Sequence, residues 1–279
     1  MGYVLVTNIF NEAERIQGII DNILLQSMRP TAWVWIDDGS TDGGIKIVER
    51  FGETGLIPIK SFRLPAKKRG NLDTIGRAWN VAHPYIRQSL RTDYLAVTDV
   101  DTRYPKNYFE RVCDFMDRHP SVGAASGNVR GRPYFNPTAP MGCGKVIRWS
   151  IIDAIESYWD MAPDSYFNIK AAILGYGLAS FRDLLIESPP ATMYSKKGRL
   201  RYGRCAYYTW LPLPRVLGNG LKDLLKSRHG SDYLRGFWQE WSRGEWRCTD
   251  PDVKRYFSMS YLLTHGRKLK KRCFSSIKS

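Results

Sequence analysis

Residues 93–102 read DYLAVTDVDT. The apolar part, Tyr94 to Val97, has the length of a buried strand. Asp99 and Asp101 follow it two residues apart, and on a strand end that spacing turns both carboxylates to the same side. Such a pair suits a hard divalent cation, because Mg²⁺ and Mn²⁺ take oxygen ligands and share them with substrate phosphates. A strand that runs into an acidic turn is the simpler alternative, since Asp is common in turns.

The residues before this stretch predict more strands of the same kind. Apolar, partly β-branched runs predict strands at 2–9, 32–36 and 56–62, with helices between them from Asn11 and from Gly43. Strands that alternate with helices through short connections indicate an α/β fold with a doubly wound, mostly parallel sheet.

Ligands of such sheets bind beyond the carboxyl ends of the strands. Three predicted strand ends carry polar or acidic residues there, at 7–11, 37–38 and 99–101. We therefore expect these three segments to meet in one crevice. The basic loop Lys67-Lys68-Arg69-Gly70-Asn71 suits an anion at a helix N-terminus, although a solvated loop explains it nearly as well.

The sequence after residue 102 predicts a helix from Pro105, a strand at 122–129, a helix at 147–159 and an aromatic helix at 232–246. Residues 171–182 predict a strand pair broken by glycines, which leads to a short helix at 183–186. The Pro-, Lys-, Arg- and Gly-rich residues 188–204 indicate a mobile basic loop that could close over a substrate.

The charge of the chain limits the partners to expect. The 279 residues carry a formal net charge of +15, and the sequence pI is near 9.6. This surplus favours anionic partners such as nucleotide diphosphates, anionic lipid surfaces or nucleic acid. The run Arg267-Lys268-Leu269-Lys270-Lys271-Arg272 indicates contact with a membrane or polyanion, and a solvated tail explains it about as well.

The sequence also bears on the compartment. No apolar run has the length of a membrane span, and the residues after Met1 do not resemble a signal peptide. The five cysteines are scattered without a CxxC pair, so neither a zinc site nor a disulfide framework is indicated. We expect a cytoplasmic protein, with peripheral contact at the inner membrane surface as a further expectation.

Three segments taken together resemble one known family. They are VLVTNIFNE at 4–12, IDDGSTD at 36–42 and Asp99-Val100-Asp101. In this order and spacing they resemble the family 2 glycosyltransferases of GT-A fold, strongly over the N-terminal third and weakly to about residue 250. The resemblance implies a GT-A catalytic domain at 1–250 with a C-terminal helical extension. Its nucleotide-sugar-binding half would be 1–102, its acceptor-binding half 103–250, and a basic tail would follow at 251–279.

The resemblance also implies roles for individual residues. The residues that would contact a UDP- or GDP-sugar are Thr7, Asn11, Glu12, Asp38, Arg69, Gly70, Asp99 and Asp101. Asp101 and Asp99 would hold Mg²⁺ or Mn²⁺, and His265 stands where parts of the family have a further metal or phosphate ligand.

The general base of the family is an Asp that opens a helix ending in Gly. The segment Gly230-Ser231-Asp232-Tyr233, with Gly244 at the helix end, matches this pattern, but Ser231 replaces the family's Glu. The resemblance therefore implies Asp232 as the base. The alternative carboxylates are Asp183, Glu187 and Asp223.

We therefore predict a metal-dependent inverting glycosyltransferase that acts on an acceptor hydroxyl or lipid phosphate of a glycan, protein or lipid. Ser231 leaves a non-catalytic nucleotide-sugar-binding protein as an alternative. The positive charge and the many Trp, Tyr and Arg residues suggest a nucleic-acid-binding protein, which the acidic strand ends disfavour, so no nucleic-acid partner is expected. A metal-dependent nucleotidyltransferase would share the acidic crevice.

Overall fold

The computed structural model describes residues 2–66, 75–132, 135–158, 163–189, 195–226 and 228–261. The chain forms two compact units, one up to Pro189 and one over Pro190–Lys271. Arg69, Gly70, His265 and the basic run at 267–272 lie outside the described residues, so the predictions on them stay predictions.

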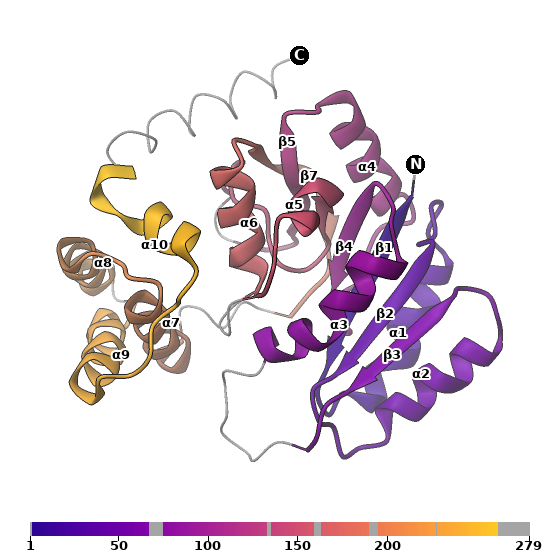
Figure 1. Cartoon of the computed structure of the whole chain (residues 1–279), viewed down its shortest axis with the longest axis horizontal. Coiled ribbons are helices and arrows are strands. Elements are labelled where there is room, and N and C mark those ends of the chain that lie inside the picture. The colour runs from indigo at the N-terminus through magenta and orange to yellow at the C-terminus, as the bar shows by residue number, and fades with distance from the viewer. Residues whose placement is uncertain are drawn as a thin grey trace. The chain divides into compact units, whose positions relative to one another are not determined.

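The first unit is built on a mixed sheet, which has seven strands within the described residues (Figure 1). The strands are β1 (Tyr3–Ile9), β2 (Ala32–Asp37), β3 (Ile59–Arg63), β4 (Tyr94–Thr98), β5 (Val122–Val129), β6 (Lys145–Arg148) and β7 (Gly177–Ile186). Their order across the sheet is β3-β2-β1-β4-β6-β5-β7. Only β6 runs antiparallel to its neighbours, β4 and β5, so the sheet is mostly parallel as predicted.

Helices cover both faces of this sheet (Figure 1). They are α1 (Ala13–Leu24), α2 (Gly44–Glu53), α3 (Ile75–Ser89), α4 (Tyr108–Arg118), α5 (Trp149–Asp153) and α6 (Pro163–Ile173). Buried residues of α1, α2 and α4 pack with one face of β1 and β2, including Tyr3, Leu5 and Trp33. Val4 and Val6 point to the opposite face and are buried as well, as expected for a doubly wound sheet.

The strand order places a topological switch point between β1 and β4. The chain moves outward from β1 to β2 and β3, and β4 then pairs with the other side of β1. The register aligns Thr7 with Thr98 and Ile9 with Asp37, so the carboxyl ends of β2, β1 and β4 lie side by side. The expected meeting of the three polar strand ends is confirmed, at the place where open α/β sheets bind ligands.

Three predictions in the first unit are wrong. The strand pair predicted at 171–182 is replaced by the end of α6 and by the single strand β7. Residues 183–186 belong to β7, because Leu185 and Ile186 pair with β5. The helix predicted at 147–159 is replaced by β6 and by the short α5, since residues 145–148 complete the sheet between β4 and β5. At 145–148 and 183–186, long-range pairing overrides a short apolar pattern that fits helix and strand alike.

The second unit is helical over its described residues. Its helices are α7 (Lys196–Tyr208), α8 (Leu213–Leu225), α9 (Gly230–Arg243) and α10 (Pro251–Phe257). The predicted aromatic helix is confirmed as α9, which ends at Gly244 in the left-handed conformation that favours glycine. These helices confirm the expected helical structure toward the C-terminus, and the predicted domain boundary at residue 250 stays a prediction.

The basic loop predicted at 188–204 is wrong from residue 196, where α7 begins. Ser195 caps this helix, since its Oγ accepts a hydrogen bond of 3.0 Å from the Gly198 amide. Gly203 of α7 and Gly236 of α9 each lie against the backbone of the other helix, where a Cβ atom would clash. The close packing of α7 on α9 explains why a sequence that looks like a loop forms a helix.

Candidate functional site

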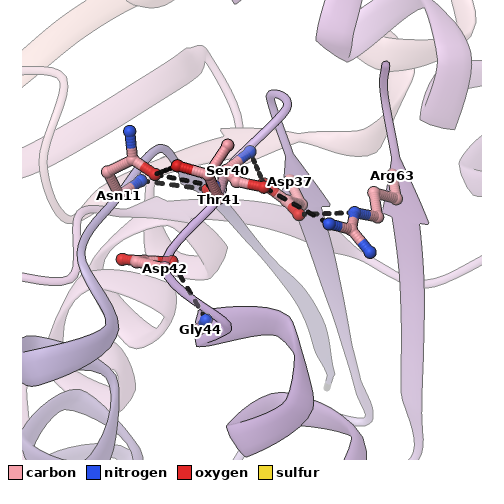
Figure 2. A network of polar contacts seen from close by, with 7 residues as sticks. All are labelled: Asn11, Asp37, Ser40, Thr41, Asp42, Gly44 and Arg63. Atoms are coloured by element: carbon pink, nitrogen blue, oxygen red, sulfur yellow. Dashed lines mark hydrogen bonds and ion pairs between the residues drawn. The ribbon is translucent and has the colours of Figure 1, made fainter. Parts of the chain in front are cut away.

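The acidic turn after β2 is held in shape by hydrogen bonds and an ion pair of its own residues and Arg63 (Figure 2). Asp37 is fully buried, and its Oδ1 accepts a hydrogen bond of 2.8 Å from the Ser40 amide. Arg63 of β3 lies with its Nε 3.3 Å from Asp37 Oδ2. Asp37 therefore shapes the turn from inside, which leaves the next residue, Asp38, as the acidic group at the end of the strand.

Asn11 and Asp42 join this turn to the start of α1 (Figure 2). Asn11 adopts a left-handed backbone with φ of 55°, and its Oδ1 accepts 2.8 Å from the Thr41 amide. Asp42 accepts from the Ala13 amide at 2.8 Å and from the Gly44 amide at 3.0 Å, so one carboxylate caps α1 and α2 together. The ends of β1 and β2 are thereby fixed relative to each other.

Glu12, Arg15 and Asp101 form a charged group at the start of α1. Arg15 Nη1 lies 3.4 Å from Glu12 Oε1 and 3.6 Å from Asp101 Oδ2. Burial, and to a smaller extent the Asp101 carboxylate, raise the pKa of Glu12 above its ordinary value. The two carboxylates are close enough to need a positive charge between them, and the guanidinium supplies it.

The donor set at the end of β4 fits a divalent cation that is shared with a substrate. Asp99 is exposed and Asp101 is half-buried, so both carboxylates can be reached from solvent. Among the described residues, no group of three or more His, Cys, Asp or Glu side chains could hold a metal ion by itself. One or two carboxylates completed by phosphate oxygens and water are the usual set for Mg²⁺ at phosphate sites.

The loop that carries both aspartates is held from below by Arg103. Its Nη1 donates to the carbonyl oxygens of Val100 at 3.1 Å and Thr102 at 2.9 Å. The guanidinium rests against Gly18 of α1, where a larger residue would displace it. The backbone of Arg103 also exchanges two hydrogen bonds with Glu187, at 2.8 and 2.9 Å. Such support holds ligand side chains in place before a ligand arrives.

Thr7 and Lys145 are buried polar groups near these strand ends, as are Asp37 and Thr102. Thr7 is fully buried, and its Oγ1 accepts 2.8 Å from the Trp33 indole, so its role toward a nucleotide stays a prediction. Lys145 is also fully buried, and its Nζ donates 2.9 Å to Asn168 Oδ1. It pairs with Val97 in the sheet, two residues before Asp99.

The sequence reasoning missed Arg15, Arg103 and Lys145. Arg15 follows Glu12 by three residues on a helix, a spacing that predicts an ion pair and could have been used. Arg103 and Lys145 find their partners across the fold, and no local pattern marks them.

In the second unit, Asp232 lies in the first turn of α9. Its Oδ2 is 3.7 Å from His229 Nδ1, and its side chain is 13% exposed. The three alternative carboxylates each have an arginine partner: Asp183 pairs with Arg111, Glu187 with Arg130, and Asp223 with Arg199. The Arg111 hydrogen bond lowers the pKa of Asp183, which makes that carboxylate a weaker base.

No helix among the described residues is long and apolar enough to cross a membrane. The family model described as glycosyl transferase family 2 matches residues 4–150. No curated protein sequence matches the chain.

Several solved structures resemble the chain at low sequence identity. The mannosyltransferase PcManGT from Pyrobaculum calidifontis, in complex with GDP-Man and Mn²⁺, matches with 16% identity and a TM-score of 0.60, covering 99% of this chain and 85% of its own. TarS 1–349 from S. aureus in complex with UDP matches with 14% identity and a TM-score of 0.55, covering 90% and 94%. The complex of TarS 1–349 with UDP-GlcNAc gives 15% and 0.55 with the same coverage. This likeness shows the fold, which is of the GT-A type.

Proposed function

The chain belongs to glycosyl transferase family 2 and is a glycosyltransferase, and we propose that it moves a sugar from a nucleoside-diphosphate sugar to an acceptor hydroxyl or a lipid phosphate. The solved structures that it resembles contain GDP-Man, UDP or UDP-GlcNAc, which supports a UDP- or GDP-sugar as the donor. One observation carries the proposal. The polar ends of β2, β1 and β4 meet at the switch point of the sheet, where Asp99 and Asp101 follow β4.

The donor would bind at these strand ends of the first unit. Asn11, Glu12 and Asp38 would contact the base and ribose, and Thr7 would support them from within β1. The network around Asn11 and Asp42 fixes this edge, so little ordering is needed when a nucleotide binds. Arg69 and Gly70, which follow β3 in the sequence, would contact the nucleotide as well.

Asp101, with Asp99 beside it and His265 as a further ligand, would hold Mg²⁺ or Mn²⁺. When bound there, the ion would neutralise the negative charge that grows on the leaving diphosphate. Arg15 is 54% exposed, so its pair with Asp101 contributes about 0–1 kcal/mol at most. The guanidinium can therefore leave Asp101 at small cost when a stronger cation and a diphosphate arrive.

The chemistry that we propose is one direct displacement. The acceptor oxygen bonds to the anomeric carbon, the bond from that carbon to the diphosphate oxygen breaks, and the nucleoside diphosphate leaves. Asp232 takes the proton of the acceptor hydroxyl, because a hydroxyl is a poor nucleophile near neutral pH. A single displacement of this kind inverts the configuration of the anomeric carbon.

The acceptor would be a glycan, a protein or a lipid, and a lipid acceptor would bring the enzyme to a membrane surface. The basic run at 267–272 supports peripheral contact with anionic lipid. We propose a cytoplasmic enzyme that acts at the inner membrane surface.

The proposed base can be tested by substitution. Asp232→Asn removes the basic oxygen and keeps the shape of the side chain, so release of nucleoside diphosphate from the donor should fall by about 10²–10⁴-fold. Nucleotide binding should not change. Asp252→Asn is the matched control, because Asp252 is a half-buried aspartate in the first turn of α10. Should Asp232→Asn keep most of its turnover, the base must be another group.

A further inference from the structure

Helix α8 exposes a stripe of leucines. The exposed residues are Leu213, Leu217, Leu221, Leu224 and Leu225, with exposed fractions from 37% to 80%. Their spacing of three and four residues puts them on one side of the helix. This spacing is typical of an amphipathic helix, and its apolar side is left uncovered by the described residues.

This leucine side is different from the side that packs into the unit. The inward residues of α8 are Val216, Gly220 and Asp223, which are all buried. Gly220 lies against Leu234 of α9, and Gly230 of α9 lies against Leu224 of α8, so the two helices pack closely without the rest of the stripe. Of the stripe, Leu224 takes part in this packing, and the contacts of Gly220 and Gly230 involve none of the other four leucines.

Helix α9 adds two exposed tryptophans. Trp238 and Trp241 are 41% and 45% exposed, and their rings stack with centroids 4.5 Å apart. Both rings also lie beside Phe237, which belongs to the core of this unit. Tryptophan is enriched where a protein meets the interface of a bilayer, because its ring is apolar and its N–H is polar.

The exposed charges around these side chains all have one sign. In residues 195–226 and 228–261 there are fourteen Lys and Arg against six Asp and Glu. None of these six carboxylates is exposed, and Asp223 and Glu240 are buried against Arg199 and Arg204. The exposed charged residues are Lys196, Lys197, Arg215, Lys222, Lys226, Arg235, Arg243, Lys254 and Arg255.

We propose that the α8 leucine stripe, with Trp238 and Trp241, docks the second unit on the surface of an anionic lipid bilayer. The leucines would enter the boundary between head groups and acyl chains, and the exposed cations would meet the lipid phosphates. A nucleic acid would also use the cations and the tryptophans, but five exposed leucines offer nothing to a phosphodiester backbone. This docking adds a membrane contact to the proposed function. It rests on that function only where the acceptor is taken to be carried by a lipid.

Binding of the full chain to vesicles tests this without any donor or acceptor, so it can fail independently of the transferase activity. Vesicles of phosphatidylcholine are compared with vesicles that also contain phosphatidylglycerol, and bound protein is measured by co-sedimentation. The wild type should bind the anionic vesicles, and high salt should weaken the binding.

Two substitutions with matched controls separate the apolar and the charged contribution. Leu221→Asn should lower the partition onto anionic vesicles about tenfold. Leu56→Asn, at a leucine of similar exposure in the first unit, should leave it unchanged. Lys222→Gln should lower it about fivefold, since one Lys near such a surface contributes about that factor. Lys46→Gln, on an exposed lysine of α2, should have no effect.

Three results would overturn the proposal. One is equal binding by the wild type, Leu221→Asn and Lys222→Gln. Another is a dimer, seen by light scattering without vesicles, that Leu221→Asn breaks, because the stripe would then bind a second copy of the chain. The third is a random oligonucleotide that binds in a salt-dependent way and displaces the protein from the vesicles.

Discussion

Arg15 places one guanidinium between two carboxylates that belong to different parts of the chain. Glu12 precedes α1, and Asp101 follows β4. Arg103, by contrast, donates from its guanidinium to the backbone carbonyls of Val100 and Thr102 and shapes the loop that holds Asp99 and Asp101. One arginine therefore balances charge at the candidate site, and the other holds its geometry.

The acidic positions at this site follow from the sequence, but their individual roles do not. Asp37 and Asp38 cannot be distinguished from the sequence alone. Only the fold points Asp37 inward, to the Ser40 amide and Arg63. Asn11 likewise stands at the start of a predicted helix, whereas in the structure its side chain accepts a hydrogen bond from the Thr41 amide. Such partners are set by long-range packing, which no local spacing encodes.

His83 offers a residue-scale test through pH. It is buried, its Nε2 lies 2.6 Å from the Ile155 carbonyl oxygen and therefore donates, and its Nδ1 has no hydrogen-bond partner among the described residues. Burial is the largest cause that lowers the pKa of His83 below its ordinary value of 6.5. The Ile155 hydrogen bond opposes this shift, and the positive charge of Arg87 adds to it. The ring takes up a proton more readily in the unfolded state, so the free energy of unfolding decreases as the pH falls below about 6.5.

His83→Gln keeps a donor for Ile155 and removes the titration. Urea unfolding at pH values from about 7 down to about 5 should give a steeper loss of stability for the wild type than for His83→Gln. The other histidines and the carboxylates contribute to both proteins, so the difference isolates His83. Parallel stability curves would refute the lowered pKa.

Helices α7 and α9 show how elements of weak local preference are fixed by packing. Leu200 and Arg204 of α7 touch Gly236, and Tyr233 and Phe237 of α9 touch Gly203. Each glycine lets the backbone of the partner helix come close. The packing requires glycine, and glycine together with many Lys and Arg residues is also typical of a loop. The sequence of α7 therefore predicts a loop where the structure has a helix.

Glycine substitutions test this packing at the scale of the element. Gly236→Ala should lower the free energy of unfolding, because overpacking costs about 1–3 kcal/mol and outweighs a helix-propensity gain of about 1 kcal/mol. Gly218→Ala is the matched control, since a Cβ atom there meets nothing within 4 Å. It should stabilise α8 by about 0.5–1 kcal/mol. Urea unfolding of the full chain measures both, and equal effects would contradict the close helix packing.

The strands were more predictable than the helices of the second unit. Apolar, partly β-branched runs at 2–9 and 32–36 mark strands that are buried on both faces, and their order with helices predicts the parallel sheet. The antiparallel β6 and the continuation of β7 through 183–186 could not be foreseen, because their backbone partners lie far away in the sequence. The pattern of apolar residues indicates that a segment is buried, but it does not indicate which strand or helix packs against that segment.

At the scale of the whole molecule, the two units differ in the charged groups that they carry. The first unit carries the carboxylates of the candidate donor site, and the exposed charges of the second unit are cationic over the described residues. The two compact units divide at residues 189 and 190. The functional halves predicted at 1–102 and 103–250 concern binding roles and stay predictions. Family and fold could be read from three short segments, whereas the sugar and the acceptor leave no such pattern.

The central claim is that the ends of β1, β2 and β4 bind a nucleoside diphosphate through a divalent cation on Asp101. Thermal shifts with UDP and GDP, each with Mn²⁺, with Mg²⁺ and with a chelator, test it most directly. One nucleotide with metal should stabilise the wild type by about 2.7 kcal/mol at about a hundred times its Kd. The chelator and Asp101→Asn should abolish the shift, and Asp114→Asn, at an exposed aspartate of α4, should retain it. Equal stabilisation with chelator, or an unchanged shift in Asp101→Asn, would contradict the claim.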